Sequence, residues 1–356
     1  MTYLSFYQNK KVLITGHTGF KGSWLSIWLN LLGAEVYGYA LEPYTKNDNF
    51  LVSGLDKRVS HHIGDIRSFN DLLSIFKRFN PEIVFHLAAQ PLVRRSYIDP
   101  KETFDTNIGG TVNILECCRL SDSVEVIVNV TSDKCYENYE WPWGYRENDR
   151  LGGHDPYSSS KAGSEIVSEA YRKSFFNQEY FNDHGKCLAT ARAGNVIGGG
   201  DWREDRLIPD CIRSLEKGEP ILLRNPDSIR PWQHVLEPLY GYLLLAVKMS
   251  DDPVKFSSAW NFGPRNDHSL KVEEVADLVV SRWGKGSIEL EKKDKDSHEA
   301  RTLCLDITKA MVELSWEPRW DTGRAVSETV DWYRNYKTSD IYRFCEEQIE
   351  QYIQES

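Results

Sequence analysis

The sequence predicts an α/β protein with a doubly wound parallel sheet and a second, smaller mixed α/β domain. Over the first 190 residues, short runs rich in Val, Ile and Leu alternate with helical patterns, and such alternation implies a parallel sheet. The runs are apolar almost throughout, as in strands that are buried on both faces. A glycine-rich turn joins the first run to the first helical stretch, as it does in many sheets of this kind.

The expected strands and helices follow one another in a regular order. Each strand is a short apolar run, and the runs are KVLITG at 11–16, AEVYGYAL at 34–41, PEIVFHLAA at 81–89, VEVIVNVTS at 124–132 and CLATARAGNV at 187–196. Helical patterns lie between them, from the glycine-rich turn to about residue 32, at about 102–119 and at about 156–176. This repetition of strand and helix is what a doubly wound sheet requires.

The pattern changes near residue 191. Beyond it the chain contains Gly-, Pro- and Trp-rich stretches such as GNVIGGGDW and RNPDSIRPWQ, and the alternation of strand and helix becomes less regular. We therefore expect residues 1–190 to form the dinucleotide-binding domain, rejoined by part of 232–262. Residues 191–356 are expected to form the smaller domain that binds the substrate.

Composition and charge exclude several classes of function. The 356 residues carry a net charge of −10, which leaves no basic excess for a nucleic acid or an anionic membrane. The seven cysteines and nine histidines have no metal-ligand spacing, so we expect reduced thiols, structural histidines and no metal site. The longest apolar stretch, LYGYLLLAV at 239–247, is too short to span a bilayer, and no secretory signal is visible. These features predict a soluble cytoplasmic protein.

The glycine-rich turn has the spacing of a loop that binds a dinucleotide. Gly16, Gly19 and Gly22 follow the first strand, where glycines let the backbone approach a pyrophosphate at a helix N-terminus. The alternative is a glycine-rich turn without a ligand. Glu42 lies where an acid that binds the ribose is expected, and no Arg stands beside it to hold a 2′-phosphate, so NAD is favoured over NADP. Asp65 could meet the adenine or be an ordinary loop residue.

Tyr157 and Lys161, in DPYSSSKAGSE, are four residues apart in an expected helix, so both project from one face. A free tyrosine titrates near ~10. A nearby ammonium, together with an oxidised nicotinamide, favours the phenolate and lowers the pKa toward the working pH. Tyr157 could then take a proton from a sugar hydroxyl while a hydride leaves the same carbon. Alone, this spacing is more often a surface pair, but here it follows a glycine-rich loop and a strand that ends at Ser132.

With these motifs the chain resembles the extended short-chain dehydrogenase/reductase family over nearly its whole length, and in particular its nucleotide-sugar dehydratases. The matching features are the three glycines, Ser132 and the Tyr157–Lys161 pair, with the stretches HLAAQPLVRRSY, TSDKCY, NVIGGGDW and RPWQHVLEPL. The family's usual Asp at the tip of the second strand has no counterpart, and Ala40 lies near that position. The resemblance implies a Rossmann fold, bound NAD and a nucleotide-sugar substrate. The NAD contacts that it implies are Gly16, Thr18, Gly19, Phe20, Gly22, Asp65, Ile66, Leu87, Ala88, Tyr157 and Lys161.

Ser132, Asp133 and Lys134 stand together at a strand end, and the resemblance makes Ser132 the hydroxyl that polarises the C4 oxygen of the sugar. Oxidation of C4 to a ketone makes the C5 proton acidic, and elimination of water across C5 and C6 then needs one base and one acid. Asp133 can be the acid if burial raises its pKa. Lys134 can be the base if desolvation and neighbouring charges keep it neutral. The alternative is a salt-bridged surface pair.

The resemblance also implies substrate contacts and an assembly. Arg230, in SIRPWQHV, is expected to bind the pyrophosphate because a guanidinium fork matches phosphate oxygens. The complete set of expected substrate contacts is Gln90, Arg94, Arg192, Asn195, Arg230, Glu299 and Arg301. For the charged members, an ordinary surface charge is the alternative. The helices at about 102–119 and 156–176 resemble the family's dimer interface, so we expect a homodimer, with a tetramer as the larger alternative.

The motifs leave three classes of activity to be weighed. The favoured one is an NAD-dependent hydro-lyase that acts on a nucleotide-activated glucose or a related hexose, and the residues themselves do not specify the base. A 4-epimerase of the same fold needs Ser132, Tyr157 and Lys161 but no elimination pair, so Asp133 and Lys134 speak against it. A non-catalytic regulator that senses redox state has no use for Tyr157 and Lys161 together.

Overall fold

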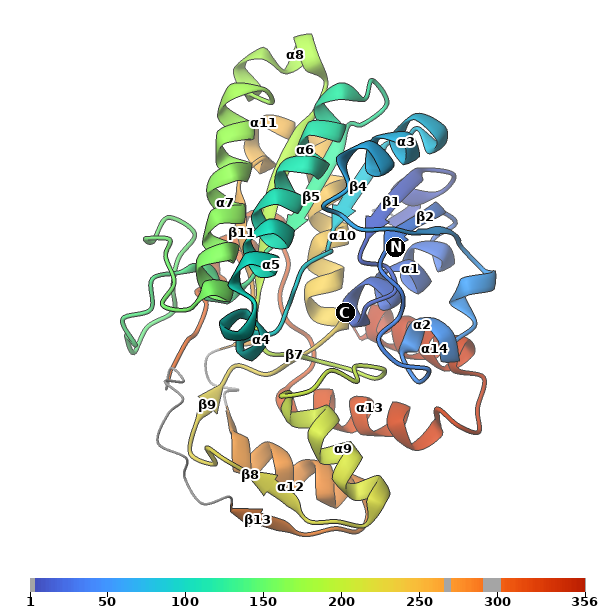
Figure 1. Ribbon diagram of the computed structural model, residues 1–356, viewed down its shortest axis with the longest axis vertical. Helices are drawn as coiled ribbons and strands as arrows, with labels where there is room; N and C mark the ends of the chain where they lie inside the picture. Colours follow the sequence, from blue (N-terminus) through green and yellow to red (C-terminus); the bar gives the residue numbers. More distant parts are fainter. Residues whose placement is uncertain (1–3, 266–269, 291–301, 356) are drawn as a thin grey trace.

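The computed structural model describes residues 4–265, 270–290 and 302–355, and its centre is a seven-stranded parallel sheet (Figure 1). The strand order is β11-β6-β5-β4-β1-β2-β3. The strands are β1 (Lys11–Thr15), β2 (Glu35–Ala40), β3 (Ser60–Ile63), β4 (Ile83–His86), β5 (Val126–Val130), β6 (Cys187–Ala193) and β11 (Ala259–Phe262). The order reverses between β1 and β4, which makes the sheet doubly wound and confirms the predicted fold class.

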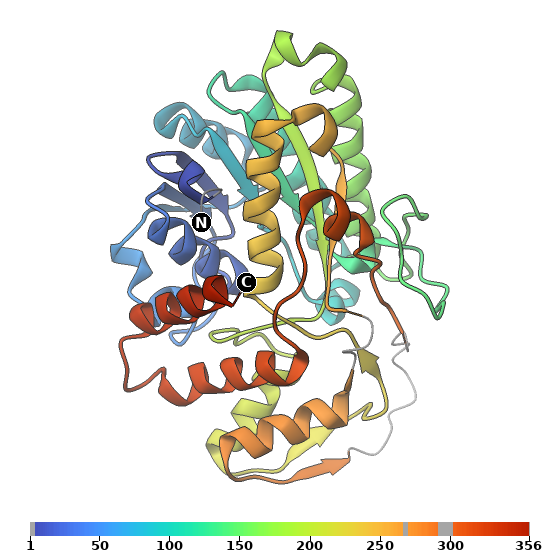
Figure 2. The same cartoon turned by 180° about the vertical axis from the view of Figure 1, so that it is seen from behind.

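Helices cover both faces of the sheet. α3 (Phe69–Phe79), α6 (Gly110–Leu120) and α7 (Pro156–Ser174) lie on the face seen in Figure 1. α1 (Phe20–Leu31) and α10 (Leu236–Asp251) lie on the opposite face, which Figure 2 shows. β5 and β6 are buried at every position, because they are covered on both sides, and this is why they read as continuous apolar runs.

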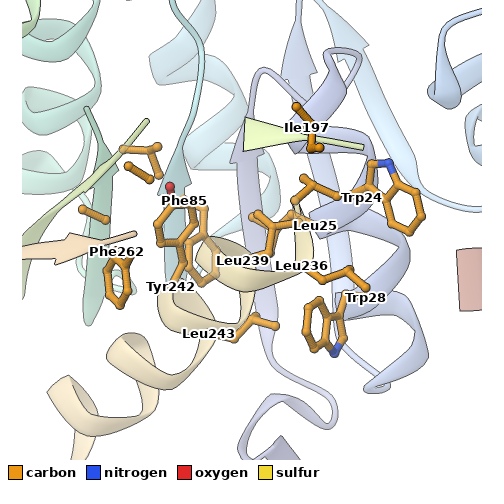
Figure 3. Close-up of a cluster of buried hydrophobic side chains, with 14 of the residues drawn as sticks. Trp24, Leu25, Trp28, Phe85, Ile197, Leu236, Leu239, Tyr242, Leu243 and Phe262 are labelled. Atoms are coloured by element: carbon orange, nitrogen blue, oxygen red, sulfur yellow. The ribbon is translucent and has the colours of Figure 1, made fainter. Parts of the chain in front are cut away.

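The core on the α1–α10 side holds the first helix against the sheet, over β1 and β2. Figure 3 shows side chains of α1 beside side chains of α10, and those labelled are Trp24, Leu25, Trp28, Leu236, Leu239, Tyr242 and Leu243. Each of these side chains is fully buried, which contributes roughly 1.5–3 kcal/mol per large apolar residue. Trp24 Nε1 also donates to the carbonyl of Gly199 over 2.9 Å. The N-terminus of α1 is therefore rigidly placed.

The helix expected at about 102–119 consists of three consecutive pieces. These are α5 (Pro100–Phe104), a π-helical turn (Asp105–Gly109) and α6. The π turn brings the Asn107 side chain to the loop that follows β4, where it accepts from the backbone N of Gln90 (2.8 Å) and donates to Ser160 Oγ (2.8 Å). The wider turn is stabilised by these side-chain hydrogen bonds, which the helical period alone does not reveal.

A smaller lobe lies at one end of the sheet, at the bottom of Figure 1. It contains α9 (Leu207–Lys217), β8 (Ile221–Leu223), α12 (Val272–Trp283) and β13 (Ile288–Leu290). Shorter elements include α2 (Asn49–Val52), α4 (Val93–Ile98), α8 (Phe181–His184), β7 (Val196–Ile197), β9 (Ile229–Arg230), β10 (Gln233–His234), α11 (Pro253–Phe256) and β12 (Leu270–Lys271).

The second half of the chain contributes to both parts of the molecule. α10 and β11 return to the sheet between segments of the lobe. α13 (Thr322–Asn335) packs on α12, and α14 (Ile341–Gln354) packs on α1. The sheet half and the lobe are therefore not two uninterrupted stretches of chain. Within the described ranges, no helix combines the length and the apolar character needed to cross a membrane.

Candidate active site

A cleft of about 1030 Å³ runs along the carboxyl ends of the sheet strands. Loops that follow β1, β2, β4 and β5 line it, and so do parts of α9 and β8 and the segment 201–206. Ligands bind at this edge of a doubly wound sheet because the connecting loops diverge where the strand order reverses. The five predicted catalytic residues and all the predicted cofactor contacts line this cleft.

The glycines of the first loop form a surface that a pyrophosphate can approach. Gly16 has a φ of +82°, and a Cβ there would lie 2.8 Å from the backbone N of Ala88. At Gly22 a Cβ would lie 2.1 Å from the carbonyl oxygen of Gly16. Gly19 is the N-cap of α1, whose first N–H groups have no partner within the helix. Larger residues at these positions would disrupt the loop. With glycines there, the phosphates of a dinucleotide can approach the N–H groups at the start of α1.

Two of the predicted cofactor contacts already have protein partners. Thr18 Oγ1 donates to the carbonyl of Leu41 over 2.8 Å and so ties the glycine loop to the end of β2. Asp65 binds Arg67, with Nη2 2.5 Å from Oδ2, and this hydrogen bond holds the pKa of Asp65 below its ordinary value. The other predicted cofactor contacts on the cleft, outside the glycines and the Tyr–Lys pair, are Phe20, Ile66, Leu87 and Ala88.

The three residues that follow β5 and Thr131 form a hydrogen-bonded turn. Ser132 Oγ donates to Oδ1 of Asp133 (2.9 Å) and accepts from the backbone N of Lys134 (3.2 Å). Asp133 is only 3% exposed, which argues against the alternative of a surface ion pair. Its carboxylate faces Gly194, where a Cβ would lie 1.9 Å from Oδ2. Asp133 needs Gly194 in order to occupy this position, and no signal in the sequence identifies this glycine.

α7 presents Tyr157 and Lys161 to the cleft from one face, as their spacing predicts. The helix starts after Asp155, whose carboxylate accepts from the backbone N of Ser158 over 3.0 Å, and Pro156 occupies its first position. Tyr157 and Lys161 are both almost completely buried. Lys161 Nζ donates to the carbonyl of Val130 over 3.3 Å, which places the ammonium at the end of β5.

Burial changes the pKa of both groups. It raises the pKa of Tyr157 from 10.0 to about 12, although a hydrogen bond with Ser132 opposes this change. It lowers the pKa of Lys161 from 10.5 to about 8, and the charge of Glu165 opposes this change. The protein groups by themselves therefore raise the pKa of Tyr157. The lowering predicted from the sequence depends on the positive charge that a nicotinamide would add.

Lys21 and Arg206 are two basic residues of the cleft that the sequence analysis did not identify. Lys21 is in the first turn of α1, where burial, Arg206 and Lys161 together lower its pKa from 10.5 to about 7. Arg206 pairs with Asp201, with Nη1 2.5 Å from Oδ2. Lys21 was recognisable as a charge inside the phosphate-loop motif GFKGS. Arg206 had no comparable signal.

Arg192, which the resemblance predicts to contact the substrate, lies away from the cleft. Its guanidinium is buried, with Nη2 2.8 Å from Oε2 of Glu165, and its Nη1 donates to Tyr136 Oη over 2.7 Å. Arg192 does not line the cleft, whereas its neighbour Ala193 does. The reason is that adjacent side chains of a strand point to opposite faces of the sheet. Arg192 therefore points to the face that α7 covers.

Among the other predicted substrate contacts, Gln90, Arg94, Asn195 and Arg230 line the cleft, and Glu299 and Arg301 lie outside the described residues. The Gln90 amide is hydrogen-bonded within the protein, since Nε2 donates to Thr103 Oγ1 over 2.9 Å. Arg230 Nη1 donates to the carbonyl of Ile229 over 2.9 Å. The described residues contain no group of three or more His, Cys, Asp or Glu arranged to hold a metal ion.

Comparison with known proteins gives one family for most of the chain. Residues 13–329 match the family model of GDP-mannose 4,6-dehydratase. The chain is 50% identical to the CDP-glucose 4,6-dehydratase of Salmonella typhimurium over 341 residues, which are 96% of this chain and 95% of that protein. It is 27% identical to a dTDP-glucose 4,6-dehydratase of Streptomyces antibioticus, with 91% of this chain and 92% of that protein covered.

Solved structures share the fold. A dTDP-glucose 4,6-dehydratase of Streptomyces venezuelae, solved with NAD bound, has a TM-score of 0.77 at 25% identity and covers 91% of this chain and 97% of its own. A UDP-glucose 4-epimerase of Thermus thermophilus in complex with NAD has a TM-score of 0.78 at 25% identity, with coverages of 91% and 98%. Dehydratases and epimerases thus share this architecture, so the side chains at the cleft must distinguish them.

Proposed function

The chain belongs to the GDP-mannose 4,6-dehydratase family, and from this we propose that it is a hydro-lyase that converts CDP-glucose into CDP-4-keto-6-deoxyglucose with NAD as a regenerated cofactor. The observation that carries the proposal is the 50% identity over 96% of the chain with a CDP-glucose 4,6-dehydratase. The quoted motifs, among them TSDKCY and RPWQHVLEPL, resemble the same enzyme. We place the product in deoxysugar synthesis for a lipopolysaccharide O-antigen.

The cleft residues support NAD as the cofactor. The surface made by Gly16, Gly19 and Gly22 at the start of α1 would hold the pyrophosphate. Glu42 lines the same cleft, at the position from which an acid can bind a ribose. When bound, NAD supplies an acceptor for the hydride of C4 and a donor of hydride to C6.

A reducing location suits the seven cysteines, since none of them forms a disulfide.

Three residues would assist the oxidation of C4 of the glucose, for which bound NAD would be the oxidant. When the sugar binds, Ser132 would turn its hydroxyl proton from Asp133 to the C4 oxygen and so hold this oxygen beside Tyr157. Tyr157 removes the hydroxyl proton as the hydride leaves the carbon, and Lys161 stabilises the resulting phenolate. The hydrogen bond between Tyr157 and Ser132 supports this arrangement, and so does the position of Lys161 four residues further along α7.

Elimination of water would use the next two residues of the same turn. With C4 as a ketone, Lys134 removes the C5 proton, and Asp133 protonates the C6 hydroxyl as it departs. The hydrogen bond from Ser132 to Asp133 supports the joint use of these residues, because it connects an oxidation residue to an elimination residue in one turn. After hydride return to C6, a proton added at C5 completes the 4-keto-6-deoxy sugar.

Arg230 would bind the pyrophosphate of the nucleotide sugar, because a guanidinium matches phosphate oxygens in geometry and charge. Its place on the cleft wall supports this role. Gln90, Arg94 and Asn195 line the same cleft and would lie near the glucose or the phosphates. All of these contacts lie on the carboxyl side of the sheet, which is where the sugar must meet Tyr157.

The experiment that tests the proposal is incubation with NAD and a panel of CDP-, dTDP-, UDP- and GDP-glucose, followed by mass spectrometry. We expect CDP-glucose to lose one water, and glucose deuterated at C4 to yield product deuterated at C6. An unchanged mass would indicate an epimerase. Stoichiometric accumulation of NADH would contradict a regenerated cofactor.

The roles of the two elimination residues can be separated by Lys134→Met and Asp133→Asn. In the Lys134 variant we expect oxidation at C4 to proceed, the 4-keto sugar to accumulate with NADH, and the C5 proton to stop exchanging with deuterated solvent. In the Asp133 variant we expect C5 exchange to persist while loss of the C6 hydroxyl slows. C5 exchange at the wild-type rate without Lys134 would remove that residue from the role of base.

We also propose a homodimer formed through α6 and α7, or a tetramer built from such dimers. These two helices lie side by side in Figure 1. These helices, together with the residue that follows α7, expose large apolar side chains to solvent, namely Val112, Leu120, Ile166 and Phe175. An apolar face of this kind is costly in a monomer and is typical of an interface. Sedimentation velocity tests this, with the expectation that Ile166→Asp shifts the protein toward the monomer.

A further inference from the structure

The segment 201–206 is held at both ends and projects its middle into the cleft. Trp202 Nε1 donates to the carbonyl of Asn47 over 2.7 Å, and Arg213 Nη1 donates to the carbonyl of Trp202 over 3.0 Å. Arg206, the last residue of the segment, pairs with Asp201, the first, so this ion pair joins the two ends of the segment. Tyr333 Oη donates to the carbonyl of Asp201 and ties the joined ends to α13. The residues between these anchors, Glu204 and Asp205, form a turn and line the cleft. The turn is therefore a built feature with an acidic tip.

Asp205 connects the two sides of the cleft. Its Oδ1 lies 3.1 Å from Arg94 Nη1, in α4 beside the sheet, and 3.0 Å from Arg224 Nη1, just after β8 in the smaller lobe. One carboxylate oxygen is thus shared by two guanidinium groups from opposite parts of the molecule. Asp205 has a φ of 59°, in the left-handed region that Asp and Asn adopt more readily than most residues.

The ion pairs of Asp205 are suited to exchange. The side chains of Arg94, Asp205 and Arg224 are 52%, 33% and 48% exposed, and ion pairs that water can reach are weak and easily broken. The deeper pairs of the molecule differ in this respect, since Asp201, the partner of Arg206, is only 6% exposed. Two arginines that share an exposed carboxylate can turn to a stronger anion without any change in the fold.

We propose that Asp205 is an internal substitute for a phosphate group of the nucleotide sugar, holding Arg94 and Arg224 until the diphosphate displaces it. The inference deepens the proposed function, because it assumes a nucleoside diphosphate substrate. Phosphate and carboxylate oxygens offer a guanidinium the same hydrogen-bond geometry, and a diphosphate offers more oxygens and more charge. Asp205 thereby keeps both arginines in place. Because its two ion pairs must be broken when an anion binds, Asp205 lowers the affinity of the cleft for that anion.

The direct test is Asp205→Asn, because Asn tolerates the same left-handed backbone and removes only the charge. The NAD-loaded enzyme is titrated calorimetrically with CDP and, separately, with cytidine. We expect the Kd for CDP to fall by about 3- to 10-fold, the scale of two exposed ion pairs, and the Kd for cytidine to stay unchanged. Unchanged or weaker CDP binding would overturn the proposal.

A matched control and a double variant make the test specific. Asp331→Asn removes the same charge from a pair with Arg282 (Nε to Oδ1, 2.8 Å) outside the cleft, so CDP binding should not change. Arg94→Gln should weaken CDP binding, and in its presence Asp205→Asn should give a smaller gain, because the two residues share one interaction. Fully additive effects would show that Asp205 acts only through its general field, contrary to the proposal.

The titrations distinguish a failure of the role proposed for Asp205 from a failure of the proposed function. If UDP, dTDP or GDP binds in place of CDP, the assigned base is wrong, and the same titration of Asp205→Asn with the nucleotide that binds still decides the role of Asp205. If none of the four diphosphates binds to the wild-type enzyme, both proposals fail. If CDP binds and Asp205→Asn does not strengthen it, only the role of Asp205 fails.

Discussion

Two buried charged clusters lie one helical turn apart along α7, and they differ in how their cations are paired. At the cleft, Lys161 donates one hydrogen bond to a backbone carbonyl, and burial lowers its pKa to about 8. One turn further, Glu165 binds Arg192 at 2.8 Å and accepts from the hydroxyls of Thr131 and Thr190. Burial would raise the pKa of Glu165, but Arg192 and the hydrogen bonds from Thr131 and Thr190 together outweigh burial and hold this pKa below its ordinary value.

The difference shows how one helix can carry both a structural and a chemical charge. A buried ion whose partners satisfy it stays charged over the whole physiological range and serves to join elements, here α7 to β6. A buried ion without an opposite charge in contact keeps a pKa near neutrality and can respond to a ligand. Removing the same kind of charge from the two clusters should therefore have opposite effects on stability.

The largest effect is expected from Arg192→Met. The substitution leaves Glu165 as a buried carboxylate without its counterion, and breaking a buried pair in this way costs about 3–5 kcal/mol of unfolding free energy. Urea denaturation at pH 7 measures the loss. Arg343→Met is the matched control, since this arginine is 55% exposed and its removal should cost less than about 1 kcal/mol. A similar small cost at Arg192 would contradict the comparison.

Lys161→Met should change stability in the opposite direction. Its pKa falls from 10.5 to about 8 on folding, so below pH 8 the folded protein holds an ammonium that burial disfavours. One pKa unit corresponds to about 1.4 kcal/mol, so the variant should gain on the order of 3 kcal/mol at pH 7. Between pH 8 and 10.5 the folded state releases this proton while the unfolded chain keeps it, so the wild type gains stability and the difference shrinks.

Denaturation curves at pH 7 and pH 10 measure this change. The variant should lose activity even where it is more stable, because Lys161 is proposed to stabilise the phenolate of Tyr157. A variant that is less stable than the wild type at pH 7 would mean that Lys161 is as well paired as Arg192.

Tyr157→Phe tests the chemical cluster without changing its charge at neutral pH. The variant retains the ring packing and loses the group that accepts the proton of the C4 hydroxyl. We therefore expect kcat to fall by at least ~10²-fold, the usual scale for a general base. Single-turnover formation of NADH from CDP-glucose is the measurement. Turnover close to that of the wild type would exclude Tyr157 as the base.

The smallest effect is expected from Thr190→Val, in the structural cluster. Thr190 Oγ1 donates to Oε2 of Glu165 over 2.7 Å, and Val preserves the shape while removing the donor. Glu165 keeps Arg192 and Thr131, so the loss of unfolding free energy should be about 1.5 kcal/mol, as for one hydrogen bond to a charged group. A loss as large as that of Arg192→Met would mean that the hydroxyl, and not the ion pair, stabilises the carboxylate.

Features that depend only on residues close together along the chain could be predicted from the sequence. The spacing of Tyr157 and Lys161 places both on one face of a helix whatever surrounds it, and the structure has them there. The glycine loop was predicted from the same kind of local geometry, since the turn into α1 leaves no space for side chains at Gly16 and Gly22. Ser132 and Asp133 follow directly from the end of β5.

The sequence by itself therefore determined the doubly wound sheet, the phosphate loop and the Tyr–Lys pair, because helical and strand periods act within a few residues. Only the tertiary structure decided that Arg192 turns away from the cleft and that Asp205 joins Arg94 to Arg224. The partners in these contacts are separated by 19 residues or more along the chain. Their meeting depends on how loops and sheet faces pack, and no local pattern of residue types contains that information.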